Sequence, residues 1–221
     1  MKTLGIFMPT YKRPDALARV AKNIEDTTKT PFTLYFGCEP DDKQSIKAAQ
    51  ATGHQCIVNQ GEQGYSNTIQ TIYENSREPF FIHANDDFVF LEAWDAPPMK
   101  MMKDDQELMV LGLHDGNPGT NFWTICMIRR KYIEEQSGVV DMPNRVFYPY
   151  KHNWQDTEFT ATAKKRGVWK HCPATAIEHH HPGFSQWFGE TPYDDTYRKN
   201  DSFIPEDSQT YESRKHLWES L

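Results

Sequence analysis

The sequence predicts an α/β domain with a mostly parallel central sheet and helices on both of its faces. Through the first 84 of the 221 residues, short apolar runs alternate with segments whose apolar residues recur at helical spacing. Polar or charged residues follow three of these runs, at 10–13, 39–42 and 85–87. Such alternation is typical of a parallel sheet covered by helices, and ligands bind such sheets beyond the carboxyl ends of the strands.

The first strand and the first helix are clearly marked. The apolar run 4–8 is stopped by Pro9, which predicts a short buried strand. A helix opens at 12–15, because Pro14 suits a first helical position and Asp15 favours the positive end of the helix dipole. Its apolar face is formed by Leu17, Val20, Ala21 and Ile24.

The same alternation continues to residue 84 and becomes less regular beyond it. The next predicted elements are a strand at 32–38, a helix at 45–52, a strand at 56–58, a helix at 65–75 and a strand at 80–84. In the second half we predict strands at 109–113 and 125–128, a helix at 156–165 and a strand at 168–177. The tail from Ser185 shows little periodicity, and we expect it to wrap the domain or close over a site.

Composition limits the classes of partner and compartment. The chain has 31 acidic against 24 Lys and Arg residues, a net charge of −7, which argues against a general polyanion binder. A local basic cluster remains at 164–166 with Lys170. The four cysteines form no CxxC pair, so free thiols in a reducing compartment are expected. No apolar run approaches about 18 residues, so we expect no membrane span and a cytoplasmic location.

The most informative stretch is Asn85-Asp86-Asp87, which lies between two apolar runs. Adjacent carboxylates at the end of a buried strand are costly unless something there requires negative charge. A divalent cation held between carboxylates and a nucleotide diphosphate is a common requirement of this kind. The stretch therefore predicts a site for Mn²⁺ or Mg²⁺ together with a nucleotide.

Four segments in order resemble motifs of family-2-like glycosyltransferases of the A fold. The opening strand and loop at 7–14 resemble the family's nucleotide-binding start, and Asn85-Asp86-Asp87 stands where the family places its Asp-X-Asp metal motif. The stretch 153–159 resembles the acidic motif that supplies the catalytic base, and 177–182 resembles a late metal-binding segment. The family's first metal-motif position is usually acidic, so Asn85 is a departure that reduces the charge offered to a metal.

The resemblance implies a single A-type domain and a role for each matching residue. It divides the chain into a nucleotide-sugar-binding half at 1–113, an acceptor and catalytic half at 114–184, and a tail or lid at 185–221. Asp87 is the expected direct metal ligand, and one or both of His179 and His181 are expected late ligands, because alternate residues of an extended segment share a face. The expected nucleotide-sugar-binding residues are Thr10, Arg13, Glu39, Asn67 and Asp86.

The catalytic pair is expected at the start of the helix 156–165. Asp156 and Glu158 are about 200° apart around a helix and cannot face the same way. The family pattern favours Asp156 as the base that takes the proton of the acceptor hydroxyl, with Glu158 as a supporting group. A single base opposite the leaving group implies inversion at the anomeric carbon.

The expected function is a metal-dependent inverting glycosyltransferase that uses a UDP-sugar. The compact chain resembles small phage-encoded members, some of which modify hydroxymethylated bases in viral DNA inside the host cytoplasm. A cell-surface glycan is the alternative acceptor, and a non-catalytic nucleotide- or sugar-binding module is the alternative class. A nucleotidyltransferase or a Rossmann dehydrogenase is disfavoured, because the loop after the first strand lacks glycine. Aromatic residues that could stack on an acceptor are Trp123, Tyr150, Trp154, Trp187 and Phe188.

Overall fold

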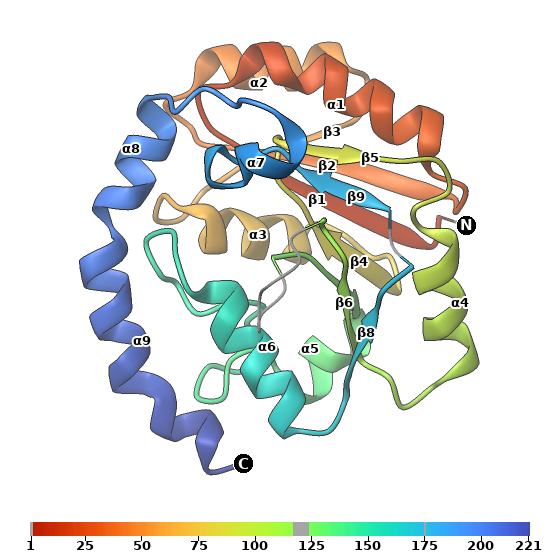
Figure 1. Ribbon diagram of the computed structural model, residues 1–221, viewed down its shortest axis with the longest axis vertical. Helices are drawn as coiled ribbons and strands as arrows, with labels where there is room; N and C mark the ends of the chain where they lie inside the picture. Colours follow the sequence, from red (N-terminus) through yellow and green to blue (C-terminus); the bar gives the residue numbers. More distant parts are fainter. Residues whose placement is uncertain (1, 117–123, 175) are drawn as a thin grey trace.

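A seven-stranded mixed sheet forms the centre of the molecule (Figure 1). The computed structural model describes residues 2–116, 124–174 and 176–221. Along the sheet the strand order is β3-β2-β1-β4-β7-β6-β8, and β7 runs antiparallel to both of its neighbours while the other pairs are parallel. The strands are β1 (Leu4–Thr10), β2 (Phe32–Cys38), β3 (Gln55–Val58), β4 (Phe80–His83), β6 (Val110–Leu113), β7 (Cys126–Arg129) and β8 (Trp169–Cys172).

Helices cover both faces of this sheet, and each face has its own apolar core (Figure 1). Along β1, Ile6 and Met8 pack with α1, whereas Phe7 points to the other face and packs with α3. This alternation is what a strand buried on both faces requires. The helices are α1 (Pro14–Thr27), α2 (Lys43–Ala51), α3 (Tyr65–Glu74), α4 (Ala96–Asp104), α5 (Arg130–Gln136), α6 (Gln155–Lys165), α7 (Ser185–Phe188), α8 (Asp195–Ser202) and α9 (Ile204–Glu219).

The strand register brings the predicted polar strand ends together. In β1, Thr10 pairs with Cys38 of β2, and Phe7 pairs with His83 of β4. The loops that follow these three strands therefore leave the sheet at one edge, as the alternating pattern predicted. A small second sheet lies beside this edge, formed by β5 (Phe88–Phe90) and β9 (Ile177–His179) in antiparallel pairing. This pairing holds the acidic residues Asp86 and Asp87 next to the histidines at 179–181.

One prediction for the second half was wrong. The single strand expected at 168–177 is two strands, β8 and β9, which belong to different sheets and are separated by a turn at 173–174. The tail, whose sequence shows little periodicity, is mostly helical. Helix α9 gives a weak apolar pattern because polar groups hold it in place: the Asp207 carboxylate accepts three backbone N–H groups, and Arg214 pairs with Glu158 of α6.

No helix among the described residues is long and apolar enough to cross a bilayer. The four cysteines, Cys38, Cys56, Cys126 and Cys172, carry free thiols, and three of them are buried.

Candidate active site

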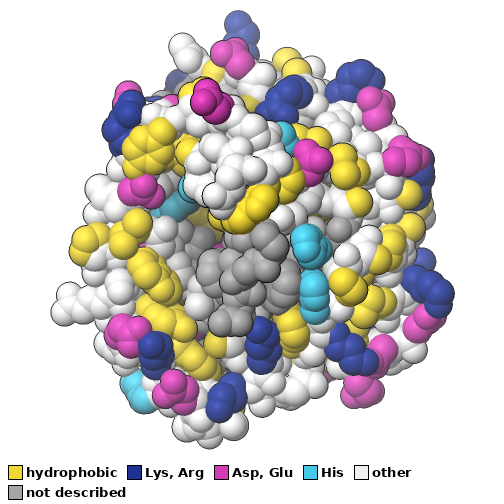
Figure 2. Space-filling model, in the orientation of Figure 1, with side chains coloured by type: hydrophobic (Ala, Val, Ile, Leu, Met, Phe, Trp, Pro, Cys, Tyr) yellow, Lys and Arg dark blue, Asp and Glu magenta, His cyan; other side chains and the backbone are white. Residues whose placement is uncertain are grey.

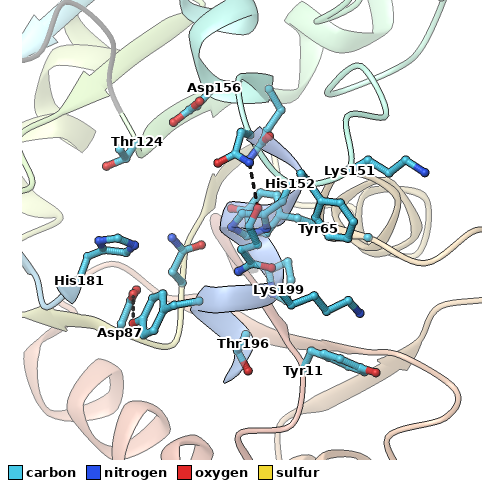
Figure 3. A pocket seen from close by; sticks show the side chains of 18 of the residues that line it. Tyr11, Tyr65, Asp87, Thr124, Lys151, His152, Asp156, His181, Thr196 and Lys199 are labelled. Carbon is cyan, nitrogen blue, oxygen red and sulfur yellow. Dashed lines mark hydrogen bonds between the residues drawn. The ribbon is translucent and has the colours of Figure 1, made fainter. Parts of the chain in front are cut away.

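A cavity of about 650 Å³ opens at the edge of the sheet where β1, β2 and β4 end. One side is lined by residues of the β1 and β4 loops and by the start of α3. The opposite side is lined by residues 151–157, by His179 at the end of β9, by His181 just after it, and by residues of α8. Figure 3 shows Asp87 and Asp156 at different ends of this cavity, with Tyr65 and His152 to one side.

Asp86 is fixed by the loop that follows β1. Thr10 Oγ1 donates to Asp86 Oδ2 at 3.0 Å, and the Arg13 guanidinium donates to Asp86 Oδ1 at 2.9 Å. Burial raises the pKa of Asp86, and the neighbouring Asp87 adds to this rise, although Arg13 opposes it. The other guanidinium nitrogen of Arg13 donates to Asp194 at the start of α8, so Arg13 connects Asp86 to that helix.

One oxygen of the Asp87 carboxylate accepts a hydrogen bond and the other does not. The Tyr197 hydroxyl of α8 donates to Asp87 Oδ2 at 2.9 Å. Asp87 Oδ1 is buried without a hydrogen bond and forms an ion pair at 3.6 Å with His179 Nε2, which also lacks a hydrogen bond. Burial acts to raise the pKa of Asp87, but His179 and Tyr197 outweigh it and lower the pKa to about 2. Asp87 is therefore a carboxylate at any physiological pH.

His179 stands between two carboxylates. Its Nε2 faces Asp87, and its Nδ1 lies 3.5 Å from Asp115 Oδ2. Burial acts to lower the pKa of His179, but Asp115 and Asp87 outweigh it and raise the pKa to about 9. A carboxylate behind the second ring nitrogen is the usual partner of a metal-binding histidine, because it fixes the ring and raises its basicity.

These residues fit a divalent cation. Two buried atoms without a hydrogen bond, Asp87 Oδ1 and His179 Nε2, face one another as an ion pair at a distance too long for a good hydrogen bond. Within residues 2–116, 124–174 and 176–221, no group of three or more His, Cys, Asp or Glu side chains is arranged to hold an ion. A pair of protein ligands suits a cation that completes its coordination with phosphate oxygens and water.

The other two histidines of the cluster differ in direction. His181 lines the cavity, and its ring packs edge-on against Tyr197 with centroids 4.9 Å apart. Its Nδ1 accepts the Gly183 N–H, which leaves Nε2 as its other ring nitrogen toward the cavity. His180 is absent from the cavity lining and contacts Glu178 and Phe188 instead. The expected alternation along 179–181 is thus present, and a metal role for His181 stays a prediction.

Asp156 lies at the other end of the cavity, in the first turn of α6. Its Oδ1 accepts the Thr157 N–H at 2.8 Å, and no described residue donates to Oδ2. Burial raises the pKa of Asp156 to about 6, against the lowering effect of the Thr157 hydrogen bonds. Trp154, just before the helix, has φ 66° and lines the cavity, so a non-glycine residue here adopts the left-handed region at the site.

Glu158 and Asn67, two of the predicted site residues, do not line the cavity. Glu158 is buried on the far side of α6, where it accepts from the Tyr150 hydroxyl at 2.6 Å and from Arg214 at 2.8 Å. The helical geometry that separates it from Asp156 leaves it a structural role, joining α6 to α9. Asn67 accepts from Arg145 and does not line the cavity, because the first turn of α3 directs it away.

Glu39 lines the cavity but is heavily used by its own loop. Its carboxylate accepts from Asn59 Nδ2, from the Gly64 N–H and from the Thr68 hydroxyl. Only 6% of Glu39 is exposed, so most of its hydrogen-bonding capacity holds the segment 59–64 in place. Its predicted role against a nucleotide base stays a prediction.

The basic cluster and most of the aromatic candidates lie away from the cavity. Lys164 contacts the Trp169 ring, Arg166 bonds to Tyr132, and Lys170 pairs with Asp105. Among the aromatic candidates, Trp154 lines the cavity, whereas Tyr150, Trp187 and Phe188 do not, and Trp123 lies outside the described residues. On the face drawn in Figure 2, positive and negative side chains are interspersed around the outer edge of the molecule.

Several cavity residues were missed in the sequence. The residues that add charge or hydrogen-bonding groups are Tyr65, His83, Lys151, His152, Tyr197 and Lys199. Asp115, behind His179, was placed only in a turn-rich loop. None of these stands in a short motif, and they converge only once the sheet is folded. His152 offered the one local signal, since it directly precedes the acidic motif at 153–159.

Comparisons with solved structures agree with this architecture. No protein-family model matches the sequence, and no curated protein matches it. Glucosyl-3-phosphoglycerate synthase from Mycobacterium tuberculosis, in complex with Mn²⁺, UDP and glucosyl-3-phosphoglycerate, superposes with a TM-score of 0.65 at 7% identity, covering 93% of this chain and 80% of that one. A mannosyltransferase from Pyrobaculum calidifontis, in complex with GDP-Man and Mn²⁺, gives 0.63 at 12% identity, covering 80% of this chain and 57% of that one.

A third structure, described as a mycobacterial protein, gives a TM-score of 0.64 at 9% identity and covers 81% of this chain and 68% of that one. Identities this low carry information about architecture alone. Strand order, the small sheet beside the carboxyl edge and the structural matches agree: the chain has the A-type glycosyltransferase fold.

Proposed function

We propose that this chain is a metal-dependent inverting glycosyltransferase that moves a sugar from a nucleotide sugar to an acceptor hydroxyl. One observation carries the proposal: at one end of a single cavity a carboxylate oxygen and a histidine nitrogen face one another without a hydrogen bond, and at the other end lies a carboxylate with a raised pKa. The first pair, Asp87 and His179, is suited to a cation that binds a diphosphate. The second, Asp156, is suited to removing a proton.

The roles of the chain's residues follow from these positions. When bound by Asp87 and His179, a divalent cation supplies Lewis-acid stabilisation for the charge on the leaving diphosphate. Asp156 Oδ2 takes the proton of the acceptor hydroxyl. As it does so, the hydroxyl oxygen bonds to the anomeric carbon, and the bond from that carbon to the diphosphate oxygen breaks. A base and a leaving group at different ends of one cavity favour attack from the opposite face, and hence inversion.

The expected donor is a UDP-sugar, bound with its nucleotide toward the ends of β1 and β2. Thr10, Arg13 and Glu39 line that part of the cavity, and Asp86 is fixed beside it. Two structural neighbours support a nucleotide-sugar donor, since one was solved with UDP and the other with GDP-Man. The second of these makes GDP-sugars the donors to compare with UDP-sugars.

For the acceptor we propose a hydroxyl borne by a ring that Trp154 can stack upon beside Asp156. A hydroxymethylated base in DNA meets this description, and so does a sugar of a cell-surface glycan. The DNA acceptor rests on the sequence resemblance, because the basic residues of 164–170 contact other parts of the domain. Incubation of the protein with a donor and either an oligonucleotide containing 5-hydroxymethylcytosine or a glycan array separates the two.

Thermal unfolding with UDP, GDP, ADP or CMP, each with and without Mn²⁺, tests the donor site. A ligand at 100 times its dissociation constant stabilises a fold by about 2.7 kcal/mol. We expect a Mn²⁺-dependent shift with UDP, and no shift with any of the four nucleotides would refute a nucleotide-sugar donor. Release of free sugar from the donor, measured with Mn²⁺, separates an enzyme from a non-catalytic module.

A further inference from the structure

A hydrogen-bonded pair in the cavity wall has no role in the reaction described above. Tyr65 is the first residue of α3, and His83 is the last residue of β4. The Tyr65 hydroxyl lies 3.1 Å from His83 Nδ1, and both residues line the cavity. The Tyr65 ring also packs near Phe147 and edge-on to His152, which fixes its direction.

The backbone decides which His83 nitrogen carries the proton. The Cys126 N–H donates to His83 Nε2 at 3.2 Å, and because a backbone N–H can only donate, Nε2 must offer a lone pair. Burial lowers the pKa of His83 to about 3, so its ring is neutral and carries one proton. That proton is on Nδ1, from which it is donated to the Tyr65 oxygen.

The proton of the Tyr65 hydroxyl is therefore left for another acceptor. Among the described residues, no side chain or carbonyl other than His83 is hydrogen-bonded to this hydroxyl. Burial raises the pKa of Tyr65 well above its usual range, and the charges of Asp156 and Asp87 add to that rise. The phenol stays protonated and presents a donor to the cavity.

The position of this donor indicates what it contacts. The charges of Asp87 and Asp156 both act on the Tyr65 hydroxyl, and Figure 3 shows Tyr65 to the side of the space between them. In the proposed reaction, the diphosphate lies at Asp87 and the acceptor hydroxyl at Asp156. The transferred sugar must lie between the two, and its hydroxyl and ring oxygens are acceptors for a phenol proton.

We propose that Tyr65, oriented by His83 and the Cys126 backbone, is a specificity-determining residue that donates a hydrogen bond to an oxygen of the donor's sugar. The assignment rests on the proposed function, since it takes a nucleotide sugar as the ligand. Because this hydroxyl can only donate to a ligand, it favours a nucleotide sugar with an oxygen lone pair at one point of the sugar. It disfavours nucleotide sugars that lack this oxygen.

The test compares binding of a nucleotide sugar with binding of its nucleotide. Tyr65→Phe removes the hydroxyl and keeps the ring, and Tyr73→Phe is the matched control on the same helix, outside the cavity. Dissociation constants are measured with Mn²⁺ for UDP and UDP-glucose, and for GDP and GDP-mannose. Of the two sugar nucleotides, the one that the wild type binds more tightly should bind Tyr65→Phe with a dissociation constant about 3- to 10-fold higher. The free nucleotide should bind as in the wild type.

Each other outcome overturns the assignment in a distinguishable way. Equal weakening of the nucleotide and its sugar derivative would place the contact on the nucleotide. Unchanged binding of both would mean that the hydroxyl contacts neither. Failure of the wild type to bind any of the four probes would overturn the proposed function itself, before the variant is considered.

The proton on His83 can be located without any ligand. A long-range ¹H–¹⁵N spectrum distinguishes an imidazole protonated on Nδ1 from one protonated on Nε2. We expect the Nδ1–H form of His83 between about pH 5 and 8, because its pKa lies well below this window. The Nε2–H form would make Tyr65 the donor to His83 and would remove the basis of the assignment.

Discussion

Replacing Asp156 by asparagine separates the charge of this side chain from its shape. Asparagine retains an oxygen that can accept the Thr157 N–H, now bonded at 2.8 Å, but it cannot take a proton from an acceptor hydroxyl. A positioned general base contributes about 10²- to 10⁴-fold to a rate. We expect the transfer rate of Asp156→Asn to fall by a factor in this range while Mn²⁺-dependent nucleotide binding at Asp87 is retained.

The same replacement should stabilise the fold. Burial raises the pKa of Asp156 from 3.8 to about 6, a difference of about 2 units, and each unit corresponds to about 1.4 kcal/mol. Because the folded pKa exceeds the unfolded one, the ionised carboxylate destabilises the fold above about pH 6, and this cost disappears as the pH falls toward 4. Asp156→Asn should thus exceed the wild type by up to about 3 kcal/mol at pH 7.5 and match it near pH 4.

Thermal unfolding at both pH values, alongside a transfer assay, measures these effects. The control is Asp15→Asn, an exposed aspartate in the first turn of α1, which should leave the rate unchanged and lower the stability by no more than about 1 kcal/mol through its loss from the helix dipole. Wild-type transfer should decline as the pH falls through about 6, since the base must be ionised to accept a proton. Transfer by Asp156→Asn at the wild-type rate would refute the assignment of the base. Equal stability of variant and wild type at pH 7.5 would refute the claim that the ionised Asp156 carboxylate destabilises the fold.

Three further replacements address the metal pair and the polar contacts of α9. Asp87→Ala removes one expected cation ligand, so the Mn²⁺-dependent thermal shift with UDP should disappear; an undiminished shift would exclude Asp87 from the site. Arg214→Met leaves Glu158 buried without its cation and should cost about 3–5 kcal/mol in urea unfolding, whereas Lys215→Met, a partly exposed neighbour, should cost less than about 0.5 kcal/mol. Asp207→Ala leaves three backbone N–H groups without their acceptor, so hydrogen exchange at these amides should accelerate; unchanged protection would show that other contacts hold them.

The first half of the fold was predictable because its signals are local. The apolar run 4–8, the proline after it and the helical face from Leu17 to Ile24 each determine an element without reference to the rest of the chain. Once the strands alternate with helices, the convergence of Thr10, Arg13 and the acidic pair at one edge follows from parallel pairing.

The remainder depends on contacts between distant residues. Helix α9 is fixed by the carboxylate of Asp207 and the guanidinium of Arg214 rather than by an apolar stripe, so its sequence has no clear period. Asn67 follows the family pattern and yet does not line the cavity, because its side-chain oxygen accepts a hydrogen bond from Arg145. Tyr65 and His83 carry no motif and become a pair only when α3 packs on the sheet.

The Asp207 and Arg214 contacts also set an order of events during synthesis. All the strands of the first half are synthesised by residue 90, and they can pair once they emerge from the ribosome, while the rest is being made. The backbone of 151–153 and the Glu158 carboxylate receive their partners only when residues 207 and 214 emerge. A nascent chain would thus acquire its nucleotide-binding edge well before its base is held in place, and a chain cut before Asp207 should bind UDP with Mn²⁺ without transferring sugar.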